Sequence, residues 1–191
     1  MLKFLNCLTF ALIFVAAAQA QGVISPNSFR LDTLRKAIES RQSNPPNREY
    51  LRRFPKTCWD FKRIFYGSNL DELSPAYEQH MALLQRLYSK YPQTVVSIWF
   101  GIATNCAWDA DALSEVQDQL ARYGSRQTKA FAETLNSIPR VKRQSIIRFL
   151  ADVENHRAYP SYKIIQINLK KTGYRRLEKE FEQAKANRMA Q

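Results

Sequence analysis

Most enzyme sites are built from histidines, glycines and acidic side chains, and this chain uses the first two sparingly. Its only histidines are His80 and His156, which have no cluster of metal ligands around them in the sequence and form no HExxH pattern. The chain has five glycines and contains none of the motifs GxGxxG, GxxxxGKS/T or GxSxG. We therefore expect no metal and no cofactor, we disfavour nucleotide enzymes and serine hydrolases, and we expect structural roles for both histidines.

One acidic residue has a neighbourhood that suggests chemistry. Glu39 and Ser40 precede a Ser-Asn-Pro-Pro stretch at 43–46, and the pair resembles the Glu-Ser signature of lytic transglycosylases. Those enzymes are exported, helical and basic, and the resemblance implies that Glu39 is the general acid that protonates a glycosidic oxygen. The family's glycine-rich Met-Gln segment and its Ala-Tyr-Asn segment have no counterparts in this chain. A glycan-cleaving enzyme that uses Glu39 is therefore the alternative to a binding function, and Glu39 is otherwise an ordinary residue on a helix surface.

The N-terminal segment has the pattern of a signal peptide. Lys3 gives a basic start, residues 4–15 form an apolar run, and Ala18 and Ala20 are the small residues that a signal peptidase recognises. We expect cleavage after Ala20, so that 1–20 is a signal peptide and 21–191 is one domain. The domain would then be secreted or periplasmic, with no transmembrane span.

The cysteines allow one disulfide bond. Cys7 lies inside the apolar N-terminal run, which leaves Cys58 and Cys106 in the exported domain. In an oxidising compartment two thiols most simply form a bridge, and closing the loop from 58 to 106 would stabilise the fold by about 4 kcal/mol. Two buried free thiols are the alternative.

The charge is strongly basic and unevenly distributed. The whole chain has a net charge of +12, and residues 21–67, 68–134 and 135–191 carry net charges of +6, −3 and +8. If the two basic regions pack side by side, they would form one face that attracts an anionic macromolecule of the envelope or the extracellular space. Export disfavours nucleic acid as the partner. A solvated basic surface without a ligand is the alternative, and the residues that we select for binding are Arg140, Arg143, Lys170 and Lys171.

Two tryptophans lie close to the cysteines in the sequence. Trp59 follows Cys58 directly and Trp108 lies two residues after Cys106, so a disulfide would bring both indoles into one neighbourhood. An aromatic cluster packed around the disulfide is the preferred interpretation, because large aromatic side chains dominate protein cores. A binding patch anchored by Trp59 and Trp108 is the second interpretation.

The apolar spacing predicts a single compact all-α domain of about seven or eight short helices, arranged as helical hairpins around a buried central helix. The uncharged segment 93–108 is apolar on every side and too short for a bilayer span, so it predicts that central helix, with a buried strand as the rival. Gly101 within it would let a neighbour approach closely. Segment 160–171 fits a strand or a helix, and we choose the helix. The other predicted helices follow Ser28 or cover 59–66, 75–91, 110–123, 125–135, 139–153 and 174–184, and Ser74 is the predicted N-cap of the helix 75–91. Gly124 is the predicted separator between two of them. In 139–153 the residues predicted to face inward are Val141, Ile146, Leu150 and Val153.

These observations favour an exported, non-catalytic helical protein that works by binding a macromolecular partner, possessing one disulfide and a basic surface. A structural envelope protein without a discrete ligand is the second alternative, after the glycan-cleaving enzyme.

Overall fold

The computed structural model describes residues 34–36, 47–66, 76–153 and 160–190, and within these residues the chain is all-α, as predicted, with no strand. Beyond a short helical stretch at 34–36, they form nine helices, slightly more than the sequence predicted. The helices are α3 (Asn47–Arg53), α4 (Cys58–Phe65), α5 (Tyr77–Tyr88), α6 (Pro92–Ala103), α7 (Ala112–Arg126), α8 (Thr128–Ser137), α9 (Arg140–Ala151), α10 (Pro160–Lys171) and α11 (Arg175–Met189).

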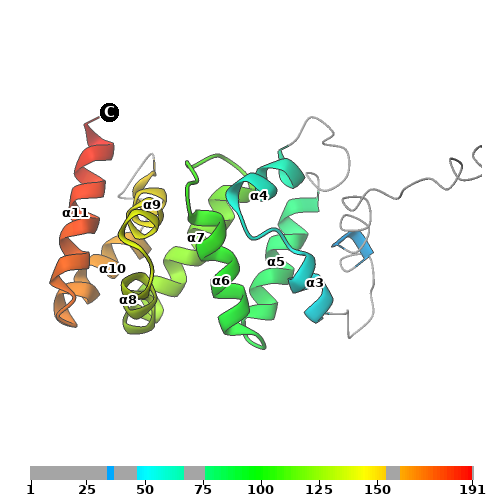
Figure 1. Ribbon diagram of the computed structural model, residues 1–191, viewed down its shortest axis with the longest axis horizontal. Helices are drawn as coiled ribbons and strands as arrows, with labels where there is room; N and C mark the ends of the chain where they lie inside the picture. Colours follow the sequence, from blue (N-terminus) through cyan, green and yellow to red (C-terminus); the bar gives the residue numbers. More distant parts are fainter. Residues whose placement is uncertain (1–33, 37–46, 67–75, 154–159, 191) are drawn as a thin grey trace, which may run out of the picture.

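The helices lie side by side along the longest axis of the molecule (Figure 1). Helices α3, α4 and α5 form one end, α6 and α7 lie in the middle, and α10 and α11 form the other end. One connected cluster of buried apolar side chains runs through the array from Leu34 to Ala184. The two basic regions of the sequence therefore lie at opposite ends of the described structure, and they do not form the single basic face that side-by-side packing would give.

Helix α6 is the buried central helix that the sequence predicted, but it ends at Ala103 and not at residue 108. Pro92 stands at its first turn, where its missing N–H removes no helical hydrogen bond, and nearly every apolar side chain of the helix is buried. Gly101 faces the backbone of the segment between α3 and α4, where a Cβ atom would collide with the carbonyl oxygen of Lys56. The expected close approach at Gly101 is therefore confirmed.

The predicted helix break at Gly124 is wrong. Helix α7 continues through Gly124 to Arg126, and Gln127 separates it from α8. A Cβ atom at Gly124 would lie 2.9 Å from Cδ1 of Ile165 in α10. The glycine thus serves close packing between two helices, a need that only the tertiary structure reveals.

Segment 160–171 is the helix α10. Its buried residues Tyr162, Ile165 and Leu169 have helical spacing, so the choice of helix over strand is confirmed.

The predicted inner face of α9 is only partly right. Ile146 and Leu150 are buried as predicted, but Val141 is 73% exposed. The inner face of α9 follows 143, 146, 147 and 150, and Val141 lies about half a turn away from that face.

Candidate functional site

Helices α9 and α11 pack against each other at the C-terminal end of the molecule and form a groove. Two ion pairs join them. The Nε and Nη2 atoms of Arg143 donate to the Glu180 carboxylate at 2.9 and 3.1 Å, near the N-terminal ends of both helices. Near their C-terminal ends, Nε of Arg188 lies 2.6 Å from Oδ1 of Asp152. The two helices therefore run in the same direction.

The Arg143 pair is largely removed from water. The Arg143 side chain is 5% exposed and that of Glu180 is 17% exposed, and Arg176 also approaches Glu180, at 3.3 Å. Because the bidentate contact uses the fork of the guanidinium, Arg143 is fixed against α11 and does not contribute an open surface charge. Of the four cations that the sequence selected for binding, Arg143 thus has a structural partner.

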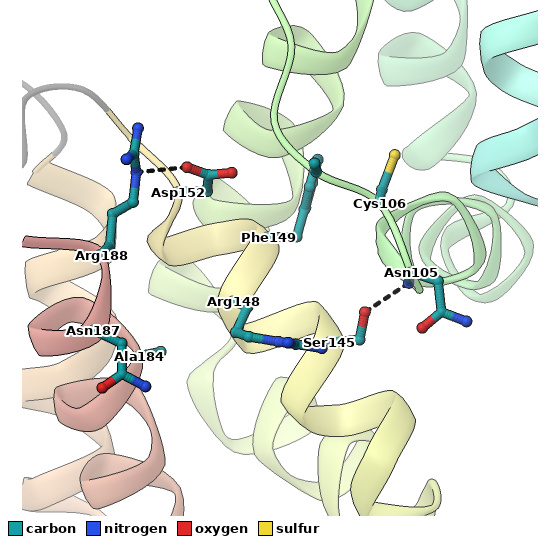
Figure 2. A pocket seen from close by; sticks show the side chains of 10 residues that line it. Asn105, Cys106, Ser145, Arg148, Phe149, Asp152, Ala184, Asn187 and Arg188 are labelled. Atoms are coloured by element: carbon teal, nitrogen blue, oxygen red, sulfur yellow. Dashed lines mark hydrogen bonds and ion pairs between the residues drawn. The ribbon is translucent and has the colours of Figure 1, made fainter. Parts of the chain in front are cut away.

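The groove consists of two hollows. One has a volume of about 360 Å³ and lies between the C-terminal parts of α9 and α11 and the loop that follows α6. Figure 2 shows Arg148 extending along α9 toward Ser145 and Asn105, with the Arg188–Asp152 pair on the other side. The second hollow, of about 440 Å³, continues toward the N-terminal ends of the two helices. Both hollows are lined by Arg148, Ala184 and Asn187, so they form one groove.

The wall of the first hollow is the loop 104–111, which is held on both sides. Toward α9, the Asn105 amide donates to Oγ of Ser145 at 2.6 Å and the Trp108 amide donates to Oδ2 of Asp152 at 3.2 Å. Toward α4, Cys106 forms a disulfide with Cys58, with 5.4 Å between their Cα atoms. The predicted cysteine pairing therefore occurs in the structure and fastens one wall of the groove to the N-terminal end.

The charges that line the groove are not balanced. Its two carboxylates, Asp152 and Glu180, are each paired with arginine. Arg140, Arg148 and Lys179 line the same groove, are exposed, and form no ion pair with any described residue. Three cations are therefore available to a ligand.

No protein-family model, curated protein or solved structure matches this chain.

The described residues contain no group of three or more histidine, cysteine or acidic side chains that could hold a metal ion, and none of their helices has the length and apolarity of a membrane span.

The preferred interpretation of the tryptophans is wrong for Trp59. Helix α4 buries Phe61 and Phe65, which leaves Trp59 on the opposite face with 68% of its surface exposed. The guanidinium carbon of Arg63 lies 5.3 Å from the centre of its ring, a cation–π contact. Trp108 is half-buried in the loop 104–111. The indoles thus do not form one packed cluster around the disulfide.

The other predicted binding residues lie in different places. Arg140 lines the groove, whereas Lys170 lines a separate hollow between α10 and α11 and Lys171 is exposed at the end of α10. Sequence reasoning missed Arg148 and Lys179. Arg148 follows Arg140 by two helical turns, a spacing that could have revealed it, but nothing in the sequence indicated that α11 would supply the facing cation.

His80 lies on α5, at the other end of the helix array from the groove (Figure 1), where it packs against the aromatic rings of Tyr50 and Phe65. It is fully buried, Tyr50 Oη lies 3.2 Å from its Nδ1 atom, and the ring of Phe65 meets its ring edge-on at 5.7 Å. Burial lowers the pKa of His80 to about 4, which keeps the ring neutral at physiological pH. His156, Glu39 and the signal peptide 1–20 lie outside the described residues, so the predictions about them remain predictions.

Proposed function

We propose that this protein is a non-catalytic binding protein of the periplasm or the extracellular space, and that the α9–α11 groove binds an anionic partner. The observation that carries the proposal is the set of three unpaired cations, Arg140, Arg148 and Lys179, in a groove whose own carboxylates are already paired. An anionic ligand would therefore meet positive charge without displacing an existing ion pair.

The shape of the groove strengthens this charge effect. Charges of one sign that line a concave surface with low-dielectric walls focus the electric field and raise the local concentration of an oppositely charged ligand. The groove's other polar side chains include the carboxamides of Gln144, Gln183 and Asn187, which bind through hydrogen bonds. Guanidinium, ammonium and carboxamide groups together suit recognition of a ligand better than proton transfer to it.

The test is a comparison of two triple variants that lose the same charge. The first variant, the groove triple, removes the unpaired cations of the groove through Arg140→Gln, Arg148→Gln and Lys179→Gln. The second variant, the α10 triple, removes three exposed charges outside the groove through Lys163→Gln, Lys170→Gln and Lys171→Gln. Heparin and polyglutamate serve as anionic probes, with neutral dextran as the blank.

We expect the groove triple to weaken binding of at least one anionic probe at least about tenfold, and the α10 triple to weaken it no more than about threefold, because exposed charges more than about 8 Å away are largely screened. Raising the salt concentration should weaken binding to the wild type and have less effect on the groove triple. Equal losses in the two triples, or no binding of any anionic probe, would contradict the proposal.

A further inference from the structure

The polar side chains of the groove are arranged in two rows. On α9 the row is Arg140, Gln144 and Arg148, and on α11 it is Lys179, Gln183 and Asn187. Within each row the residues are four apart, so they lie on one face of their helix and span about 12 Å along its axis. Because the Arg143–Glu180 and Asp152–Arg188 pairs make the helices parallel, the two rows run side by side in the same direction.

The ends and the middle of this double row differ in chemistry. Arg140 and Lys179 lie at one end, Arg148 lies toward the other, and the carboxamides of Gln144 and Gln183 lie between them. Nε2 of Gln183 donates to Oδ1 of Asn187 at 2.7 Å, which leaves the Oε1 acceptor of Gln183 and the amide donors of Asn187 available. The groove therefore presents positive charge toward both ends and paired donors and acceptors in the middle.

The floor between the rows is apolar. Ile147 and Ala184 line the groove and are buried, and Val141, which is 73% exposed, also lines it. An apolar side chain of a ligand would be partly removed from water here. A bilayer surface is too flat to enter such a groove, and the lining has no exposed aromatic ring on which a sugar could stack.

Resting on the proposed function, we propose that the occupant is an extended acidic peptide with the pattern acidic-x-apolar-x-acidic. In an extended chain, side chains two residues apart point to the same side, and four residues span about 13 Å, which matches the length of the rows. The first and last side chains of the pattern meet the cations, the central apolar side chain contacts the floor, and the peptide backbone hydrogen-bonds to Gln144 and Gln183. Backbone amide and carbonyl groups offer the donor and acceptor that a carboxamide needs.

The test measures binding of short labelled peptides to the full exported domain by fluorescence anisotropy. The matched peptide carries Glu-Thr-Leu-Thr-Glu, and a scrambled peptide of the same composition and charge carries Glu-Glu-Leu-Thr-Thr. A third peptide, Glu-Thr-Ser-Thr-Glu, keeps the charges and removes the apolar side chain. We expect the matched peptide to bind at least about fivefold more tightly than either of the others.

Protein variants test which cation binds which carboxylate of the peptide. Each of the single variants Arg140→Gln and Arg148→Gln should reduce the preference for the matched over the scrambled peptide to less than about twofold, because each removes the cation that binds one carboxylate of the matched peptide. Gln144→Ala with Gln183→Ala should weaken matched and scrambled peptides alike, and Lys163→Gln on α10 is the control that should change neither. Circular dichroism melting of each variant shows whether the fold is kept, and all these side chains are exposed or half-buried.

The proposal that the groove binds anions and the proposal that its occupant is a peptide can fail separately. If all three peptides bind equally, or if only heparin or anionic phosphatidylglycerol vesicles bind and their binding needs Arg140 and Arg148, the peptide proposal is wrong and the anionic groove remains. If no anionic probe binds through the groove, both proposals are wrong.

Discussion

The two ends of this molecule are both basic in sequence but use their cations differently. At the α3–α4 end, Arg52 and Arg53 are paired with Glu49 at 2.6 and 2.8 Å, Lys62 is paired with Asp109 at 3.1 Å, and Arg63 covers a tryptophan ring. At the α9–α11 end, Arg143, Arg176 and Arg188 form ion pairs with described carboxylates, while many other cations do not.

This difference shows that net charge alone does not identify a binding surface. Four of the cations at the N-terminal end are already engaged within the protein, and the strong pairing is visible in Glu49, whose pKa is lowered to about 2 by its hydrogen bonds to Arg52 and Arg53. The C-terminal end combines unpaired cations with a groove. The hollow between α10 and α11 also has lysines, but its carboxylates Glu178 and Glu182 form no ion pair with a described residue. In the α9–α11 groove the carboxylates are already paired with arginine, so a ligand meets unpaired cations there without facing a free carboxylate.

The forces that hold the two ends also differ, and the disulfide gives the largest expected effect. Replacing Cys58 and Cys106 by serine removes a cross-link over 48 positions of sequence and should cost about 4 kcal/mol of unfolding free energy, which lowers Tm by roughly 10 °C. Calorimetry of the double variant beside the wild type measures this. A Tm change below about 2 °C would mean that the N-terminal end does not depend on the bond.

The C-terminal end should depend on its buried ion pair. Arg143→Met leaves the Glu180 carboxylate without its closest partner in a poorly hydrated site, and we expect a loss of about 3 kcal/mol in chemical denaturation. The double variant Arg143→Met with Glu180→Leu should recover most of that loss, because no buried charge is then left unpaired and Arg176, which loses its contact with Glu180, is exposed to water. If the double variant is less stable than the single one, the ion pair contributes more than a well-packed apolar contact would.

The buried histidine should make the N-terminal end sensitive to acid. The pKa of His80 is about 4 in the folded protein and about 6.5 in the unfolded chain, so the unfolded state binds the proton first as the pH falls. Stability should therefore decrease between pH 6.5 and pH 4, by at most about 3 kcal/mol, and this decrease should level off below pH 4. His80→Phe, which cannot take up a proton there, should show a smaller loss over this range in denaturation measured at each pH. Identical pH profiles for the variant and the wild type would contradict the burial effect.

Local patterns in the sequence were sufficient for most of the helices, although α3 (Asn47–Arg53) was not predicted. The proline at the start of α6, the Thr57 hydroxyl that accepts from the Asp60 amide at the start of α4, and the spacing of Tyr162, Ile165 and Leu169 in α10 are all features that a few neighbouring residues determine. The errors arose where a distant element decides the outcome. Gly124 packs against α10 and Val141 turns to solvent because of contacts that no local pattern contains.

The groove was predictable only in part for the same reason. Arg140 was selected from the sequence, and the spacing of Arg148 on the same helix was readable there. Arg143 is buried where it donates to Glu180, which lies 37 positions further along the chain. This contact depends on the parallel packing of α9 and α11, which no local pattern reveals. The sequence therefore indicated a basic C-terminal region but did not indicate which of its cations remain unpaired.

The central claim is that anion binding belongs to the groove and not to basic charge in general. The most direct test compares the groove triple Arg140→Gln, Arg148→Gln and Lys179→Gln with an N-terminal triple of equal charge loss, Arg52→Gln, Lys56→Gln and Arg63→Gln, all at exposed positions. Affinity for the same anionic probe is measured at physiological ionic strength. We predict a loss of at least about tenfold for the groove triple and less than about twofold for the N-terminal triple. Equal losses at the two ends would contradict the account.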